Sequence, residues 1–144
     1  MSNKRKGFTL MELLVAVTIV ITLSAIGIAS YRSANQKGRD GKRKSDVNQV
    51  RAALEMYRSD NGLYPNTGDG SGNDWDGMLS TLGSGYINNV PLDPRSNDGW
   101  TYYYNSSDGY TYIICALLES ETGGSCSGSP SCGGGTCNYQ FSNP

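Results

Sequence analysis

The sequence contains no histidine in its 144 residues. Serine and cysteine nucleophiles usually depend on a histidine base, so this absence excludes Ser-His and Cys-His catalysis. No other set of catalytic residues converges in the sequence, and we expect the protein not to be an enzyme. The four cysteines include no Cys-x-x-Cys pair, which argues against a zinc site.

Basic side chains are scarce in the second part of the chain. Residues 59–144 carry one basic residue, Arg95, against nine acidic residues, whereas residues 1–58 carry eleven basic and four acidic residues. The formal net charge of −1 therefore hides two parts of opposite sign. Nineteen glycines and ten tyrosines are not typical of a protein with many membrane spans, so we expect one small soluble domain behind one apolar segment.

Charge is almost absent from residues 8–29. These 22 residues contain one charged side chain, Glu12, and they follow a basic head of Lys4, Arg5 and Lys6. As a helix they would reach roughly 33 Å, close to the ~30 Å hydrocarbon core of a bilayer. A carboxylate inside such a run is costly, so Glu12 requires a partner.

Three interpretations of this run compete. A secretory signal peptide would use a cleavage site such as Gly-Ile-Ala at residues 27–29, but its apolar run would be shorter and uncharged. A plain membrane anchor explains the length of the run and leaves Glu12 unexplained. The third interpretation follows from the order of the features. A basic head, Gly7, the sequence Phe-Thr-Leu-Met-Glu from Phe8 to Glu12 and an apolar helix closely resemble the prepilin-peptidase site of type IV pilins and pseudopilins.

The resemblance implies a processing route. A membrane prepilin peptidase would cut between Gly7 and Phe8, release a leader peptide, and methylate the new amine of Phe8. In this family the glutamate at the position of Glu12 pairs with the amine of a neighbouring subunit during assembly. Opposite charges stabilise each other strongly in a low dielectric, and a single charge there is costly. The alternative is that Glu12 only reaches toward the membrane interface.

The resemblance also predicts a homopolymer, in which the chain is a structural subunit of a type IV pilus filament on the cell surface. Such a filament serves motility, adhesion or DNA uptake. The alternatives are a major pseudopilin of a type II secretion or competence system and a monomeric membrane-anchored binding domain. The precursor would cross the inner (cytoplasmic) membrane once and then enter an extracellular pilus or an envelope pseudopilus. Expected partners are prepilin peptidase, the inner-membrane assembly machinery and the membrane before assembly, with DNA as a further candidate.

One charge pattern opposes this topology. Six basic residues follow the apolar run within residues 32–44, against three before it, and the positive-inside rule would keep that side in the cytoplasm. The cleavage site requires the opposite orientation, because prepilin peptidases act at the cytoplasmic face. The basic cluster could instead rest against acidic lipid head groups outside the bilayer.

The helical pattern is predicted to resume after a local break. Gly38 and Gly41 each cost about 1 kcal/mol relative to alanine in a helix, so we expect a melt or bend within residues 36–41. Apolar residues at 3-4-3 spacing then form one core-facing stripe, and Asn61-Gly62 with Pro65 ends the helix. The stripe consists of Val47, Val50, Leu54 and Tyr57.

The remainder predicts a small head. Asp74 is a cap for a short helix that ends at Leu82. Residues 100–104 and 110–117 are rich in aromatic and β-branched residues and flank a polar turn, which predicts a hairpin. The fold class is therefore α+β and pilin-like, with a long N-terminal helix packed on a small antiparallel sheet. The expected parts are a leader (1–7), a transmembrane and assembly helix (8–31), an amphipathic half of the long helix (32–61), a globular head (62–121) and a Gly/Ser/Cys-rich tail (122–144).

The tail is too poor in apolar residues to fold by itself, so cross-linking is the expected way to hold it. A domain outside the cytoplasm favours disulfides over zinc. Four cysteines allow three pairings, which the sequence leaves open. The candidates are Cys115, Cys126, Cys132 and Cys137.

Some major pseudopilins hold calcium in a C-terminal loop, and the resemblance therefore makes Asp93, Asp98 and Asp108 calcium candidates. The sequence lacks EF-hand spacing, and Asp-Gly pairs commonly form turns. No other metal or cofactor is expected.

Overall fold

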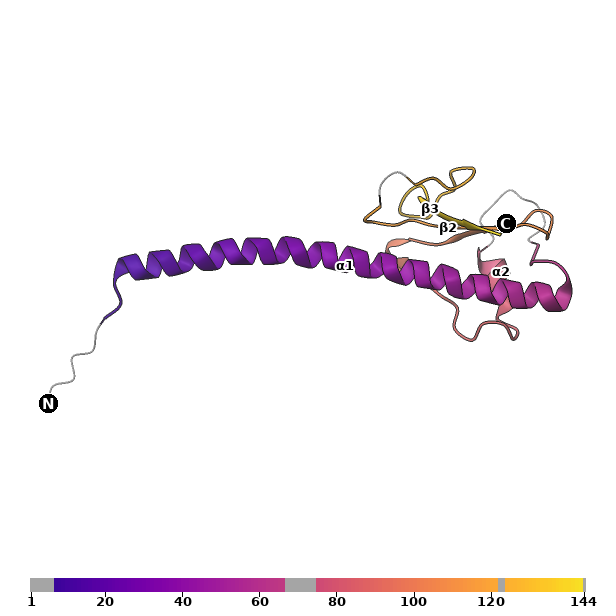
Figure 1. The fold of residues 1–144 in the computed structure, drawn as a ribbon, viewed down its shortest axis with the longest axis horizontal. Helices are drawn as coiled ribbons and strands as arrows, with labels where there is room; N and C mark the ends of the chain where they lie inside the picture. The colour runs from indigo at the N-terminus through magenta and orange to yellow at the C-terminus, as the bar shows by residue number, and fades with distance from the viewer. Residues whose placement is uncertain (1–6, 67–74, 122–123, 144) are drawn as a thin grey trace. The chain divides into compact units, whose positions relative to one another are not determined.

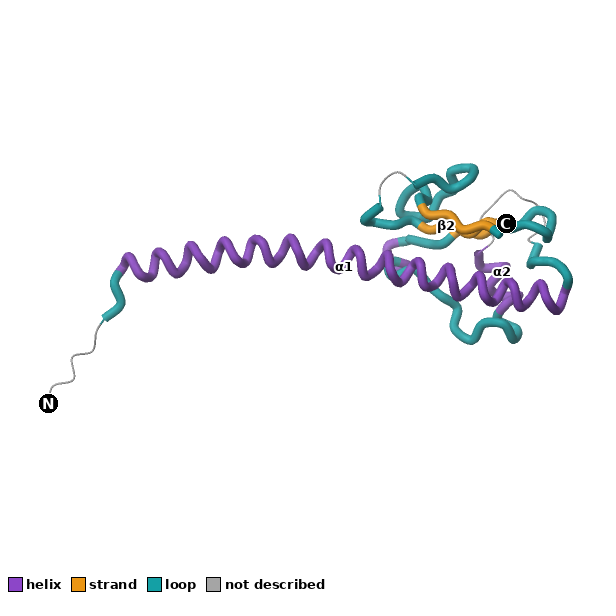
Figure 2. Tube along the Cα trace, in the orientation of Figure 1, coloured by secondary structure: helices purple, strands orange, loops and turns teal. Residues whose placement is uncertain are grey.

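The structure, a computed structural model, describes residues 7–66, 75–121 and 124–143. The chain divides into two compact units, Met1–Asn35 and Gln36–Pro144, and the first helix contributes to both. In chain order (Figures 1 and 2) the elements are α1 (Leu10–Asn61), α2 (Trp75–Leu82), the 3-10 helix η1 (Ser96–Asp98), β1 (Tyr103–Asn105), β2 (Ile113–Ala116) and β3 (Tyr139–Ser142).

The second unit, Gln36–Pro144, is called the head from here on, and it is built around the apolar stripe of α1. Val47, Val50 and Leu54 are fully buried, as the 3-4-3 spacing predicts, and Tyr57 packs at the margin of the same core. Burying one such aliphatic side chain contributes roughly 1.5–3 kcal/mol. The α+β prediction of a long helix packed on a small antiparallel sheet is therefore confirmed. Most of the other core residues come from α2 and the sheet region: Trp75, Met78, Leu79, Leu82, Tyr102, Tyr104, Tyr112, Ile114 and Ala116.

The expected melt at residues 36–41 is wrong, because α1 is helical without interruption from Leu10 to Asn61. Gly38 and Gly41 lie inside it with open space around them. Among their neighbours, buried Arg43 pairs with Asp93, and buried Asp40 accepts hydrogen bonds from the backbone N–H groups of Glu119 and Ser120. These contacts to later parts of the chain hold the helix across both glycines. Tertiary pairing has therefore overridden a local propensity cost of about 1 kcal/mol per glycine.

Helix α1 ends where the sequence indicates. Asn61 is its last residue, and its side-chain amide donates to the Tyr57 carbonyl at 2.9 Å. Gly62 follows with φ +83°, a left-handed conformation that closes helices at low cost when the residue is glycine. The short helix α2 ends at Leu82 as predicted, whereas the Asp74 cap lies outside the described residues.

The sheet has the order β1-β2-β3, with both pairings antiparallel. Strands β1 and β2 form the predicted hairpin, in which Tyr104 lies opposite Ile114. Strand β3 was not predicted, because it lies within the glycine- and serine-rich tail. It pairs with β2 so that Phe141 lies opposite Ile114. The head therefore includes part of the segment that the sequence assigns to a separate tail.

Candidate assembly site

The start of α1 carries a reciprocal cap around Glu12. The Glu12 carboxylate accepts hydrogen bonds from the Thr9 backbone N–H and the Thr9 hydroxyl, both at 2.9 Å. The Glu12 backbone N–H donates to the Thr9 hydroxyl at 3.2 Å. This is a capping box, which was not predicted although its Thr-x-x-Glu signature is present in the sequence. Both carboxylate bonds use Oε2, so Glu12 Oε1 has no partner among the residues that the structure describes.

The residues at the expected cleavage site lie outside regular structure. Gly7, Phe8 and Thr9 precede the first helical residue, and the Phe8 side chain is 84% exposed. The bond between Gly7 and Phe8 is therefore in an open, non-helical segment. An extended, accessible backbone is what a peptidase requires of its substrate.

The apolar side chains of α1 in the first unit have no cover. Those of the large apolar residues from Leu10 to Ile28 are 45–84% exposed. By length and composition alone, α1 is the one helix in the described parts of the chain that could cross a membrane. An apolar surface of this extent requires lipid or other protein around it.

Arg43 forms the centre of a buried ion-pair cluster in the second unit. Its side chain is 0% exposed and donates two hydrogen bonds to Asp93, at 2.8 and 3.0 Å. It also donates to Asp40 and Glu119, each at 2.8 Å. The guanidinium lies 4.7 Å from the centre of the Trp100 ring. One cation therefore joins α1 to two segments that are 50 and 76 residues away in the chain.

Charge pairing sets the protonation of this cluster. Burial alone would lower the pKa of Arg43, but its bonds to Asp93 and Glu119 outweigh burial and raise that pKa. Arg39 donates twice to Glu119, at 2.7 and 2.6 Å, and together with Arg43 it lowers the pKa of Glu119 to about 2. Arg39, Arg43 and Glu119 are therefore charged at neutral pH, and charge-assisted hydrogen bonds stabilise the cluster.

The basic residues that follow the apolar run are largely paired within the head. The sequence-based interpretation left them free to rest on acidic lipid. Four of the six instead meet carboxylates of the second unit, so that their charge is matched internally. These pairs are Arg39–Glu119, Lys42–Asp46, Arg43–Asp93 and Lys44–Glu121.

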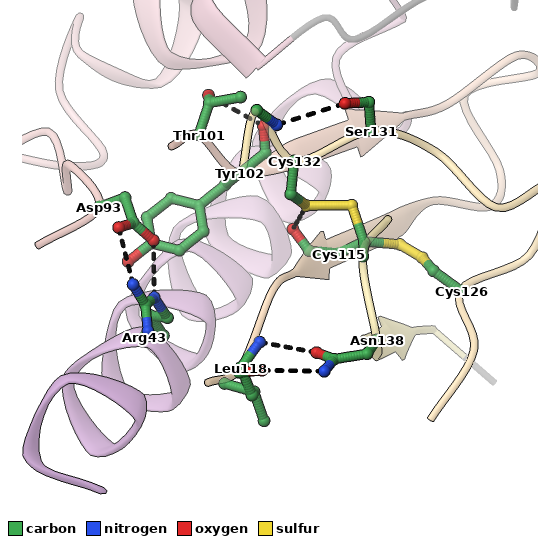
Figure 3. The surroundings of a disulfide bond; sticks show 12 residues. Arg43, Asp93, Thr101, Tyr102, Cys115, Leu118, Cys126, Ser131, Cys132 and Asn138 are labelled. Carbon is green, nitrogen blue, oxygen red and sulfur yellow. Dashed lines mark hydrogen bonds and ion pairs between the residues drawn. A yellow bond between two sulfur atoms is a disulfide. The ribbon is translucent and has the colours of Figure 1, made fainter. Parts of the chain in front are cut away.

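The four cysteines form two disulfides, Cys115–Cys126 and Cys132–Cys137. This selects one of the three pairings that the sequence left open. The two bonds pack against each other, with the Cys132 sulfur 3.8 Å from the Cys115 carbonyl oxygen (Figure 3). All four cysteines are at most 2% exposed.

The three calcium candidates do not come together. Asp93 is buried against Arg43, and Asp98 accepts from the Arg95 guanidinium at 2.9 Å. Asp108 accepts from the backbone N–H groups of Tyr110 and Thr111 and thereby closes the hairpin turn. In the described ranges no group of three or more metal-binding side chains could hold an ion. Each of the three carboxylates has a separate partner in this structure, and calcium binding by them stays a prediction.

Two family models match the chain. The model described as "Prokaryotic N-terminal methylation motif" matches residues 2–29, and the model described as "Type II secretion system (T2SS), protein G" matches residues 30–127. The chain is 32% identical over 103 residues to the type II secretion system core protein G of Escherichia coli (strain K12), covering 67% of this chain and 71% of that protein.

Other relatives cover more of the chain. The core protein G of Pseudomonas aeruginosa is 31% identical over 131 residues, which is 85% of this chain and 90% of that protein. The protein of the same name from Vibrio cholerae is 28% identical over 131 residues, with 85% and 86% covered. No solved structure matches the chain. Because one family model spans more than half of its residues, the chain belongs to the family of protein G of the type II secretion system.

Proposed function

We propose that the chain is the major pseudopilin of a type II secretion system, a structural subunit that polymerises through α1 into a pseudopilus. The names of its relatives and the match over residues 30–127 support secretion rather than a surface pilus. A type IV pilus subunit is the less specific candidate, since the N-terminal signal alone does not separate the two. The precursor is held by α1 in the inner membrane, and the polymer lies in the envelope.

The observation that carries the proposal is the uncovered apolar surface at the start of α1. Between Leu10 and Ile28 it has no cover from the chain's own described residues. Lipid covers such a surface before assembly, and the same segments of other subunits cover it afterwards. Each subunit is related to the next by the same rotation and translation. When this relation does not form a closed ring, the subunits build a helical filament.

Processing precedes assembly in this proposal. Prepilin peptidase cuts between Gly7 and Phe8 and methylates the Phe8 amine. The open backbone of residues 7–9 supports this site, and the cut leaves the Thr9–Glu12 cap intact. The inner-membrane assembly machinery of the secretion system then adds the mature subunit to the polymer.

Glu12 supplies the charge that recognises the added subunit. Its Oε2 is used by Thr9, whereas Oε1 remains available to the Phe8 amine of a neighbour. A carboxylate and an ammonium group that leave water together must find each other, because either one alone is costly in a low dielectric.

The experiment compares Glu12→Ala and Glu12→Gln with wild type, each expressed as the only subunit. Both variants lack the charge, while glutamine keeps an oxygen that can accept the Thr9 bonds. We expect the fraction of subunit in sheared filaments to fall on the order of a hundredfold in both variants, because each leaves an unpaired amine in the polymer. Processing at Gly7–Phe8 should be retained.

The two substitutions separate the assembly role from the capping role. Normal filament yield from Glu12→Gln with loss in Glu12→Ala would mean that Glu12 acts only as a helix cap. Normal yield from both variants would refute the charge-pairing proposal. A wild-type chain that forms no filament with its own assembly machinery would favour a monomeric anchored domain.

A further inference from the structure

The head contains two separate clusters of buried side chains. The main core runs from Val47 to Ala116 and takes no buried residue from the tail. The second cluster consists of the four cysteines, against which Tyr103, Ile113 and Leu117 pack. In the described part of the tail, residues 124–143, the only buried side chains are therefore those of disulfide-bonded cysteines.

The chain just before the tail is held differently. The segment 118–121 is fastened to α1 by the bonds of Glu119 to Arg39 and Arg43. The Asp40 carboxylate also accepts hydrogen bonds from the backbone N–H groups of Glu119 and Ser120, at 2.9 and 2.8 Å. These contacts need no disulfide, so residues 118–121 attach to α1 by charge, whereas the buried side chains of residues 124–143 are all cysteines.

Beyond the disulfides, the tail contacts the head at several places, among them Asn143, which accepts from the Tyr112 backbone N–H at 2.9 Å and donates to the Tyr110 carbonyl at 3.0 Å. The Cys132 carbonyl accepts from the Thr101 backbone N–H at 3.1 Å. Gly134 lies so close to the Trp100 ring that a Cβ there would overlap the ring atoms. The Asn138 amide bonds the Leu118 backbone, accepting at 2.6 Å and donating at 2.9 Å (Figure 3), and β3 then pairs with β2.

These contacts are mainly polar and bury little apolar side-chain area, so they offset little of the entropy cost of ordering the tail without cross-links. Half of the twenty residues from 124 to 143 are glycine or serine. Glycine loses more backbone freedom on ordering than any other residue, and the tail offers little apolar area in return. Its two aromatic contributions, Tyr139 and Phe141, are only partly buried.

We propose that oxidation of the two cysteine pairs is the step that docks the tail, so that β3 joins the sheet only in an oxidising compartment. The reduced chain keeps the core of α1, α2, β1 and β2 and leaves residues 124–143 undocked. The pairing follows chain order, since Cys115 joins the next cysteine and Cys132 joins the one after it. An oxidant that meets the chain as it crosses the membrane can therefore form both bonds without later rearrangement.

The chemistry requires a disulfide-containing oxidant. A thiolate of the pair attacks the oxidant's disulfide to give a mixed disulfide and one thiol of the oxidant. The second thiolate then displaces the other sulfur. Each cysteine pair loses two electrons and two protons, and the oxidant is reduced to two thiols. Thiol–disulfide exchange is thus the class of reaction that must precede completion of the sheet.

Amide hydrogen exchange on the full chain in detergent micelles tests this proposal. The samples are the oxidised protein, the same protein reduced with dithiothreitol, and the reduced protein re-oxidised with oxidised glutathione. Reduction should accelerate exchange of amides 139–142 on the order of tenfold or more, while amides 47–54 of α1 stay within about threefold. Re-oxidation should restore protection in β3.

Variants separate the two bonds from chemical side effects of the reductant. One carries Cys115→Ser with Cys126→Ser, a second carries Cys132→Ser with Cys137→Ser, and a third carries all four substitutions. The third should match the reduced wild type and should not respond to dithiothreitol. Protection of β3 in the reduced wild type would overturn the proposal. So would equal acceleration at residues 47–54, because the head would then unfold as one unit.

A fluorescence measurement gives an independent answer in a Trp75→Phe background, where Trp100 is the remaining tryptophan. Reduction should shift Trp100 emission to longer wavelength, because Gly134 no longer covers the ring. An unchanged spectrum would contradict undocking. Neither readout depends on filament formation, so this inference can fail while the proposed function stands.

Discussion

Arg43 is the residue on which most of the buried charge in the head depends. Its guanidinium is shared by three carboxylates, and none of the four side chains is more than 8% exposed. Buried ion pairs contribute little net stability against an apolar replacement of the whole group, but removal of one partner leaves uncompensated charge. The cluster therefore determines how the later segments attach to α1 more than it adds stability.

The Arg43→Met variant tests this role. We expect the free energy of unfolding to fall by about 3–5 kcal/mol, because Asp40, Asp93 and Glu119 lose the cation that offsets their burial. The measurement is urea unfolding of the oxidised chain in detergent micelles, followed by near-UV circular dichroism.

Lys42→Ala is the matched control for Arg43→Met, because Lys42 pairs with Asp46 on the same helix but is 54% exposed. Its removal should change the free energy of unfolding by less than about 1 kcal/mol. Equal losses from the two substitutions would mean that burial of the cluster has no energetic consequence.

Glu119 predicts an acid dependence of stability. Its pKa in the folded chain is lowered from 4.5 to about 2, by Arg39 first and then by Arg43. A carboxyl whose pKa is lower in the folded chain than in the unfolded chain stabilises the folded state at every pH above its unfolded pKa. This stabilisation is lost as the pH falls through its folded pKa. The contribution of Glu119 should therefore fade between pH 4.5 and about 2.

The variant Glu119→Gln measures this contribution directly. It removes the charge, so its deficit in the free energy of unfolding should be largest at pH 7 and should shrink as the pH falls through the same window. Urea unfolding of both proteins at pH 7, 4 and 3 provides the comparison. A deficit that is constant across these pH values would show that Glu119 acts by shape alone.

At the scale of elements, α1 shows how distant contacts determine a helix. Gly38 and Gly41 favour a break, and the ion pairs of the flanking residues hold the segment helical. The same long helix also carries two different surfaces, an uncovered apolar one and a stripe that enters the core. Its periodicity explains the stripe, whereas its continuity depends on partners that lie far away in the chain.

Gly41→Ala should stabilise the head. The position is exposed, helical and open, and alanine is favoured over glycine in a helix by about 0.5–1 kcal/mol. Urea unfolding of the oxidised chain measures the gain. A loss of stability would mean that residues 36–41 bend, as the sequence alone indicates.

Gly134→Ala is the opposing control in the same assay. An alanine Cβ at this position overlaps the Trp100 ring, so the tail must shift away from the head. We expect this variant to be destabilised, and its β3 amides to exchange faster than those of wild type. Both substitutions add one methyl group, so only the surroundings of the added methyl differ.

The whole molecule combines an N-terminal unit, Met1–Asn35, in which no described residue is buried, with a head whose buried charges are paired within the chain. This division fits a subunit whose contacts with other copies lie mainly in the apolar part of α1.

We predict that the mature protein begins at Phe8 with a methylated amine. Intact mass and N-terminal peptide mapping of protein from envelopes or sheared filaments measure this.

The same mass experiment has a clear contrary outcome. A chain that begins at Ser30 would indicate a secretory signal peptide. A chain that retains Met1 in the assembled form would exclude processing.

Alkylation without prior reduction on the same sample should label no cysteine, because all four are paired in the described structure.

Features that depend on neighbouring residues could be predicted from the sequence. The basic head, Gly7, Glu12 and the apolar run identify the N-terminal signal, and turn residues locate the hairpin and the end of α1. These predictions succeed because helix periodicity, turn chemistry and hydrophobic length are local properties. The Thr9–Glu12 cap was equally local, and its signature was present in the sequence.

Features that join distant residues could be found only in the folded structure. Asp93 and Glu119 meet Arg43 across 50 and 76 residues, and no local pattern pairs them. The choice of Cys115–Cys126 and Cys132–Cys137 required the sulfur positions, since four cysteines allow three pairings. Strand β3 was hidden because a glycine- and serine-rich tail has little strand propensity of its own. It becomes a strand because the disulfides hold it beside β2, where its backbone groups find partners.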